Sequence, residues 1–446
     1  MLSLMLLLRN RSARESGLGT SVVLSPSGTA VLLHAMRKAI NIGLRAVVML
    51  SRFALLFMLA RLLAPEDVGM YGLFAASIKY GVMLVGLDFY TYSTRELLGS
   101  DRSRWAHHLW NQLIVFGVSW AVAVPLVAIL FWIGPLPWSY MGWFVLILVS
   151  DHLALEFVRL LVAAGRPIRS NFVLLVRWGV WVWAVIALML AVPAARGLET
   201  VLTGWAVGAA ASAVLGLVSL RGLGLGPVDH RLDWPWIKRG LRTASVLFAA
   251  TLCLHAIFTL DRFMVGAFAG RAFLGVYTFY VGVAMAVISF LDAGVFAFLY
   301  PPLVTAARTS RPQAFAHSFR TLAVQTVAVS SALILAAGVL IHPVLSLIGR
   351  SIYTEHLSVF YLLLAGIGLY ALGMIPHWGL YAKGKDGSLL LSHAVGLAAF
   401  LAASVLAARV WVEGAVAVGF VAGFATILLV KWVAFRSSLD QVGAEA

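Results

Sequence analysis

The chain has 446 residues, of which 62% are hydrophobic and only 11% are charged. A soluble domain typically carries about 25% charged residues, so this composition excludes a water-soluble globular protein. The formal net charge is +15, but the basic residues form short clusters between apolar runs, a pattern typical of membrane topology. We therefore expect membrane lipids as partners and no nucleic acid.

Residues 1–35 precede the first long apolar run. Residues 1–8 are apolar and the sequence Arg-Asn-Arg-Ser-Ala-Arg follows them, whereas a signal peptide carries its basic residues before its apolar core. We expect a disordered cytoplasmic tail or an over-extended start, with Met36 as the natural beginning, and assign this segment no function.

From residue 39 onward the sequence predicts twelve transmembrane helices, because a helical span needs about 20 mainly apolar residues. The predicted spans are 39–63, 69–94, 109–133, 139–163, 170–193, 199–220, 242–268, 273–300, 318–341, 356–382, 387–408 and 413–435. The longest inside loop, 221–241, separates a first lobe (36–220) from a second lobe (242–446). The expected fold is an all-α polytopic membrane protein with two six-helix lobes around a central cavity.

The distribution of Lys and Arg predicts the orientation. The termini and the loops on one side carry 23 basic residues, including Lys431 and Arg436, and the opposite loops carry 5. By the positive-inside rule both termini are cytoplasmic, and we expect a multi-pass protein of a bacterial inner membrane.

The two halves of the sequence resemble each other after their first spans. The segment 62–71 ends in Gly69-Met70-Tyr71, and the segment 268–277 ends in Gly275-Val276-Tyr277. The span that follows each segment ends in an aspartate, Asp88 or Asp292. Such similarity indicates parallel repeats related by an axis along the membrane normal.

Cations inside the spans are the first group of candidate site residues. A charge in hydrocarbon costs about 3 kcal/mol or more unless it faces water or a partner. Arg45 and Arg52 are seven residues apart and therefore lie on nearly one helix face. We predict an electropositive cavity for a phosphate or carboxylate ligand, for which Arg is well suited. Its candidate residues are Arg45, Arg52, Lys79, Arg177 and Arg262.

Carboxylates and a histidine form the second group. The ion-coupling candidates are Asp88, Glu156, His255, Asp261 and Asp292. Each also has a structural interpretation. Asp88 and Asp292 lie near the cytoplasmic face, Glu156 can pair with Arg159 three residues on, Asp261 can pair with Arg262, and His255 can be a satisfied buried histidine.

Motifs for catalysis and metal binding are absent from the sequence. There is no Gly-x-x-x-x-Gly-Lys-Ser/Thr loop for nucleotide hydrolysis and no His-Glu-x-x-His or Cys/His set for zinc. The single cysteine, Cys253, excludes a disulfide framework. Outside loops of about 15 residues at most leave no room for a catalytic ectodomain. We expect no catalytic residue, no metal, no cofactor and no enzymatic activity.

Several motifs point to one family. They are Ser51-Arg52-Phe53, the run 60–72 with Ala64-Pro65-Glu66-Asp67-Val68-Gly69, then Leu87-Asp88-Phe89, Arg95-Glu96-Leu97, the run 260–266 with Leu260-Asp261-Arg262-Phe263, Gly275-Val276-Tyr277, and Tyr300-Pro301. Together they resemble the polysaccharide-transporter (O-antigen flippase) family of the multidrug/oligosaccharidyl-lipid/polysaccharide exporter superfamily. The sequence departs from the family pattern at Phe89, where a glycine commonly follows the aspartate.

The resemblance implies a flippase that moves an undecaprenyl-diphosphate-linked oligosaccharide across the inner membrane by alternating access, for export of an O-antigen or exopolysaccharide. It implies a lipid-linked oligosaccharide and polysaccharide polymerase machinery as partners. It also implies that Arg52, Asp261 and Arg262 are cavity or gating residues.

Three other interpretations remain open from the sequence. A cation-coupled multidrug exporter would have the same fold, although cationic drugs favour carboxylates deep in the cavity. A membrane glycan polymerase or ligase is opposed by the short outside loops, and a lipid II flippase by its usual fourteen spans.

Overall fold

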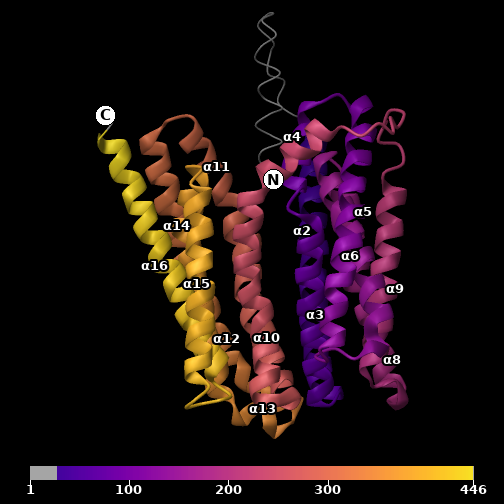
Figure 1. Ribbon diagram of the computed structural model, residues 1–446, viewed down its shortest axis with the longest axis vertical. Helices are drawn as coiled ribbons and strands as arrows, with labels where there is room; N and C mark the ends of the chain where they lie inside the picture. The colour runs from indigo at the N-terminus through magenta and orange to yellow at the C-terminus, as the bar shows by residue number, and fades with distance from the viewer. Residues whose placement is uncertain (1–27, 445–446) are drawn as a thin grey trace, which may run out of the picture.

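The computed structural model describes residues 28–444, and between these limits every regular element is helical. The first lobe contains α2 (Gly28–Leu62), α3 (Pro65–Gly86), α4 (Tyr90–Gly99), α5 (Arg102–Trp132), η1 (Trp138–Tyr140), α6 (Met141–Ala163), α7 (Pro167–Leu175), η2 (Val176–Val180), α8 (Trp181–Ala191), η3 (Pro193–Ala195) and α9 (Leu198–Ser219). The second lobe contains α10 (Trp234–Leu291), η4 (Asp292–Phe296), α11 (Ala297–Arg308), α12 (Pro312–Ile348), α13 (Ser351–Glu355), α14 (Leu357–Ala382), α15 (Asp386–Ala407) and α16 (Ala415–Ala444). The two lobes stand side by side (Figure 1).

Helix α10 is two antiparallel helices joined at Gly270, which has a left-handed backbone (φ 82°). The Tyr277 hydroxyl donates a 3.2 Å hydrogen bond to Asp261 Oδ2, although 16 residues of straight helix would separate the two by about 24 Å. The chain therefore doubles back at Gly270, a turn that glycine makes without a steric penalty.

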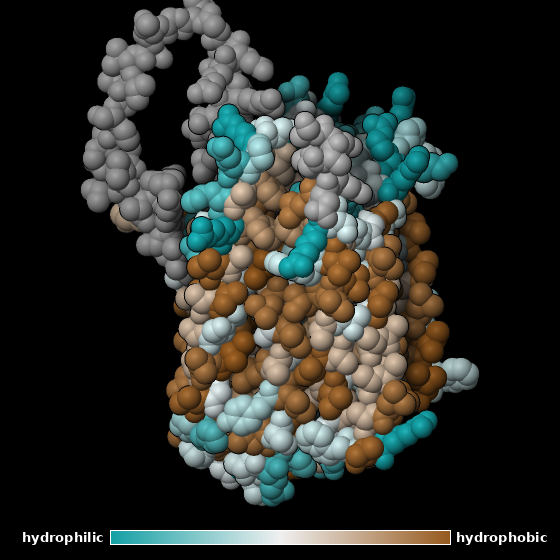
Figure 2. Space-filling model, turned by 90° about the vertical axis from the view of Figure 1, so that its left-hand side faces the viewer, coloured by the Kyte–Doolittle hydropathy of each residue, from teal (hydrophilic) through white to brown (hydrophobic). Residues whose placement is uncertain are grey.

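The long helices match the predicted spans. Ten helices of the described chain are long and apolar enough to cross a membrane, and one of them, Trp234–Arg308, contains the two arms of α10. Helix α6, with 23 residues, is also long enough but carries charged side chains in its interior. On the face that Figure 2 shows, hydrophobic side chains cover the middle and hydrophilic ones gather at both ends. The prediction of about twelve transmembrane helices in two lobes is confirmed.

Two predicted boundaries differ from the structure. Helix α2 begins at Gly28, inside the segment 1–35 that was expected to be a tail, and the first 27 residues of that segment lie outside the described part. The non-helical segment between the lobes is shorter than the predicted linker 221–241, because α10 begins at Trp234. Its Asp233 carboxylate accepts a 3.0 Å hydrogen bond from the backbone N–H of Trp236 and caps the new helix.

Both ends of the described chain lie at one end of the molecule, which we name the terminal end; α13 marks the opposite, distal end (Figure 1). The lobes are packed tightly at the distal end, where α3 runs along the second arm of α10. A Cβ atom on Gly275 would lie 2.0 Å from the Pro65 carbonyl oxygen, and one on Gly69 would lie 2.5 Å from that of Arg271. The Arg350 guanidinium also donates to the Leu63 carbonyl oxygen across the lobes. The repeated Gly-x-Tyr segments thus meet each other at the distal contact.

The substitution Gly275→Val is expected to push the lobes apart at the distal end. The new side chain collides with backbone at Pro65, so the helices themselves must move, and overpacking of this kind costs about 1–3 kcal/mol. In a background without the native cysteine, spin labels at Arg61 and Arg271 should show a longer, broader distance distribution. Gly117→Val is the matched control, because a Cβ atom there has no neighbour within 4 Å. Unchanged distances in the Gly275 variant would contradict the tight contact.

Candidate functional site

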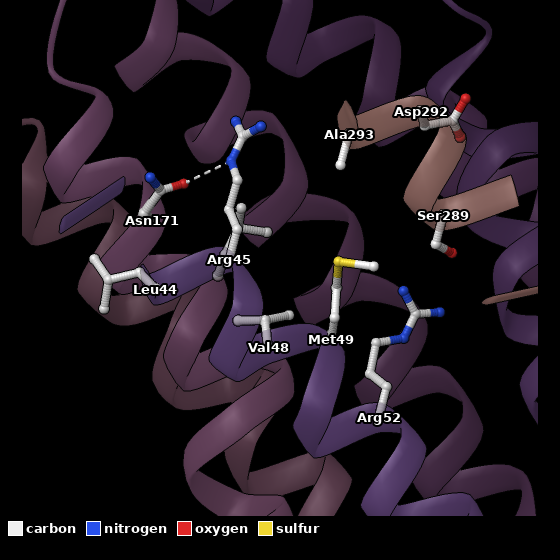
Figure 3. Close-up of a pocket in the computed structure, with 10 residues that line it drawn as sticks. Leu44, Arg45, Val48, Met49, Arg52, Asn171, Ser289, Asp292 and Ala293 are labelled. Carbon is white, nitrogen blue, oxygen red and sulfur yellow. Dashed lines mark hydrogen bonds between the residues drawn. The ribbon is translucent and has the colours of Figure 1, made fainter. Parts of the chain in front are cut away.

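A cavity of about 340 Å³ lies between the lobes and is lined from both sides (Figure 3). The first lobe contributes one face of α2, with Arg45 and Arg52, and Asn171 of α7. The second lobe contributes Ser289 at the end of α10 and Asp292 at the start of η4. Arg45 and Arg52 project into the same space because seven residues make two helical turns.

The cavity lies on the terminal side of the distal contact. Along α2, the cavity-lining residues precede Leu56, which fits against Gly282 of the opposite lobe. Along the second arm of α10, Gly275 and Gly282 make the contact, and Ser289 follows them toward the terminal end. The lobes are therefore closed at the distal end and separated by a cavity nearer the terminal end.

Arg45 and Arg52 are held differently. The Arg45 Nε lies 3.5 Å from Asn171 Oδ1, and its side chain remains exposed. The Arg52 guanidinium carbon lies 5.0 Å from the centroid of the Trp178 ring, a cation–π contact that orients the guanidinium without neutralising it. The described residues include no carboxylate within ion-pairing distance of either arginine. Both charges remain available to a ligand.

Lys79 is also exposed, although it lies in the middle of α3. Its ammonium stands 6.0 Å from the centroid of the Phe258 ring of α10, on the opposite lobe. The charges of Arg52, Arg262, Asp261 and Asp292 all act on it. Lys79 thus adds a third unpaired cation to the space between the lobes, beyond the residues that line the cavity itself.

The structure corrects the prediction that Arg177 is a free cavity cation. Arg177 lies in η2, a π-helical turn, and its Nε donates a 2.9 Å hydrogen bond to Asp151 Oδ1 of α6. The indole N–H of Trp205 donates to the other carboxylate oxygen at 3.3 Å. The side chains of Arg177 and Asp151 are only 9% and 1% exposed. Arg177 is therefore the buried partner of a carboxylate in the core of the first lobe.

Arg262 is likewise bound to its neighbour. Its guanidinium donates to both Asp261 carboxylate oxygens, at 2.9 and 3.0 Å, and to the Phe258 carbonyl oxygen at 2.6 Å. Asp261 is fully buried and also accepts the Tyr277 hydroxyl. Arg262 is therefore not a free cation, and the hydrogen bond from Tyr277 to Asp261 links the two arms of α10.

Three of the predicted ion-coupling carboxylates lie in three different places. Glu156 accepts hydrogen bonds from Gln112, at 2.9 Å, and from Arg159, so it is bound within the first lobe. Asp88 follows Leu87 in a left-handed break between α3 and α4 (φ 50° and 47°). Asp292 is exposed in the cavity. Only Asp292 faces the cavity cations directly.

The second lobe holds two buried basic residues that were not among the predicted site residues. Lys431 was counted with the cytoplasmic flank of the last span, but it is 1% exposed inside the lobe, and His393 is 3% exposed. In the sequence, the one sign that Lys431 and His393 could be site residues is that each is a polar residue in an apolar span. Their neighbours in the fold come from other helices and cannot be read from the local sequence. His255, the remaining ion-coupling candidate, lies near them.

Solved structures of MATE transporters share this fold. An inward-facing conformation of a multidrug resistance MATE family transporter of the MOP superfamily matches with a TM-score of 0.73 and 13% identity, over 91% of this chain and 99% of that chain. An outward-facing conformation of a multidrug resistance MATE family transporter of the MOP superfamily matches with a TM-score of 0.59 and 14% identity, over 91% of this chain and 97% of that chain.

A MOP superfamily transporter from Pyrococcus furiosus, for which reverse polarity of the binding pocket suggests a different function, matches with a TM-score of 0.57 and 13% identity, over 90% of this chain and 93% of that chain. No protein-family model and no curated protein matches the sequence. At these identities the likeness shows the fold, a multi-pass membrane architecture found in transporters.

Proposed function

We propose that the protein is a membrane transporter that works by alternating access of the cavity between its two lobes. The position of the cavity, on the terminal side of the tight distal contact, supports this function. The higher TM-score to an inward-facing transporter than to an outward-facing one (0.73 against 0.59) supports the same conformation here. With cytoplasmic termini, as the distribution of basic residues predicts, the cavity would open toward the cytoplasm of a bacterium.

The charge of the cavity supports an anionic, lipid-linked substrate. Arg45 and Arg52 line the cavity and Lys79 lies beyond them between the lobes, whereas Asp292 is the one carboxylate among the described lining residues. Arg binds phosphate oxygens through two parallel N–H bonds, and the cavity volume is within the range of small-molecule sites. An undecaprenyl-diphosphate-linked oligosaccharide would place its diphosphate at these cations and its polyprenyl tail in the bilayer. Polysaccharide polymerase machinery would then use the translocated product.

Multidrug export is the second candidate, and the structural neighbours support it more directly. The MATE structures with the same fold are described as multidrug resistance transporters. Asp292 could also attract a cationic drug to the cavity. The two candidates differ in the sign of the substrate charge, and this makes them separable by experiment.

Proteoliposomes test both candidates together. We expect movement of a fluorescent undecaprenyl-diphosphate oligosaccharide from one leaflet to the other, and no export of a cationic dye such as ethidium. Protein-free liposomes control for spontaneous movement. Dye export without movement of the lipid would establish the second candidate instead, and movement of neither under proton or sodium gradients would contradict both.

A further inference from the structure

Four basic side chains from four helices of the second lobe act on one another electrostatically. They are His255 of α10, His377 of α14, His393 of α15 and Lys431 of α16. We name this set the His–Lys cluster. Lys431 and His393 are 1% and 3% exposed, and within the described chain none of the four takes part in an ion pair. The cluster is therefore a group of basic residues without a counter-charge.

The hydrogen bond of His393 determines which ring nitrogen carries its proton. Its Nδ1 lies 2.8 Å from the carbonyl oxygen of Ala250. Because a carbonyl oxygen only accepts, Nδ1 must be the donor, and in the neutral ring Nε2 then keeps an open lone pair. That Nε2 is buried without a hydrogen-bond partner, as are Nδ1 of His377 and Nδ1 of His255. The rings of His377 and His393 lie parallel with their centroids 6.1 Å apart. The cluster thus presents a free proton acceptor in its interior.

Lys431 gives the cluster its second proton-binding group. A buried ammonium without a counter-charge costs several kcal/mol, whereas a neutral amine in the same place does not. A metal ion does not fit this set of residues: the described part of the chain contains no group of three metal ligands, and an ammonium would repel a cation. A proton is the ligand that needs neither a carboxylate nor a cavity.

The cluster is connected electrostatically to the space between the lobes. The charge of Lys431 acts on His377 and His393, and that of His255 acts on His393. Lys79 of the first lobe in turn acts on His255. His255 and His377 are partly exposed, whereas His393 and Lys431 are buried. These are the titratable groups that act on Lys431 and His393 or on their neighbours, and through His255 they include Lys79 of the first lobe.

We propose that the His–Lys cluster is the proton-binding site of this transporter, with Lys431 and Nε2 of His393 as the groups that accept the proton. Only an N–H bond forms or breaks when the site fills or empties. A proton on the cluster adds positive charge next to His255 and so changes the field at Lys79, which links protonation to the charge of the cavity. This role rests on the proposed transport function, but proton binding itself can be measured without any substrate.

The pH dependence of thermal stability tests the site in substrate-free nanodiscs. Tryptophan fluorescence would report the unfolding midpoint between pH 5.5 and 8.5. Acid pH forces a charge into the cluster, so we expect the wild-type midpoint to fall as the pH falls. In Lys431→Met the fall should be less than half as large, and Lys431→Arg, always charged, should have a low midpoint at every pH. The exposed Lys238→Met is the matched control and should follow the wild type.

Two outcomes would overturn the proposal. One is a Lys431→Met variant whose midpoint follows the wild type across the pH range. The other is a pH dependence that disappears when gluconate replaces chloride, because the cluster would then bind an anion. His393→Gln provides the second variant, since its amide cannot take up a proton, and it should also flatten the curve. In the transport assay, Lys431→Met should lower the rate stimulated by a pH gradient at least 5-fold, whereas the exposed Lys238→Met should keep the wild-type rate. If transport fails while the substrate-free midpoint still depends on Lys431, the proposed transport function is wrong and the proton site stands.

Discussion

Replacement of Arg45 and Arg52 by Gln together is expected to lower translocation of the lipid diphosphate about 100-fold or more. A hydrogen bond from a charged donor contributes about 1.5–3 kcal/mol, and two such bonds account for about 3 kcal/mol at the lower limit, or roughly 100-fold in affinity. Neither arginine is neutralised by a protein carboxylate, since no described acidic group lies within ion-pairing distance. Initial rates in proteoliposomes, at equal amounts of folded protein, would measure the loss.

The controls for this prediction separate charge from shape. Arg45→Lys with Arg52→Lys keeps both charges but loses the two-pronged geometry, so its loss should be smaller. Arg308→Gln removes an exposed cation at the end of α11, away from the cavity lining, and should have no effect. A double Gln variant that translocates the lipid at the wild-type rate would contradict the anionic site. A gain in ethidium export by the same variant would favour the multidrug candidate.

Arg177→Met is expected to destabilise the protein by about 3–5 kcal/mol, because removal of one partner leaves a charge buried alone. Asp151 would keep only the 3.3 Å hydrogen bond from Trp205, and its side chain is 1% exposed. The loss should appear as a lower midpoint of unfolding by SDS in mixed micelles, followed by tryptophan fluorescence. Arg308→Met is the matched control and should lie within about 0.5 kcal/mol of the wild type.

A second substitution should rescue the Arg177 variant. Asp151→Leu with Arg177→Met replaces the buried ion pair by apolar side chains of similar size, an exchange that is often neutral or stabilising. The double variant should therefore be more stable than Arg177→Met alone, and this non-additivity is the signature of a direct pair. If the two losses simply add, the stabilising role that we assign to this pair is wrong.

Much of the fold follows from the sequence because the bilayer imposes it. Runs of about 20 apolar residues must form helices, since no water is present to satisfy an exposed backbone. The repeated Gly-x-Tyr segments also indicated two related halves, and the structure brings Gly69 and Gly275 together at the distal contact. The predicted end of the tail and the predicted end of the linker were less accurate, because α2 and α10 both begin in polar segments that precede apolar ones.

The candidate site was predictable only where its residues share one helix. Arg45 and Arg52 lie on one face of α2, and the seven-residue spacing is enough to place them together. Arg177 and Asp151 are 26 residues apart on different helices, so hydropathy could not reveal that they neutralise each other. Lys431 resembled a flanking cytoplasmic cation, yet the packing of α16 against its neighbours buries it.

Hydropathy, charge pattern and internal similarity are therefore enough to predict the class of protein, the helices, the two halves and the unusual charges in apolar spans. Which of these charges are free depends on the distances between side chains of separate helices, and these distances come from the packing of the fold. Coulomb attraction in a medium of low dielectric constant is strong over a few ångströms, so partners from separate helices decide whether a cation is neutralised or available. By this criterion Arg45, Arg52 and Lys79 remain unpaired in the described chain, while Arg177 and Arg262 each hold a carboxylate.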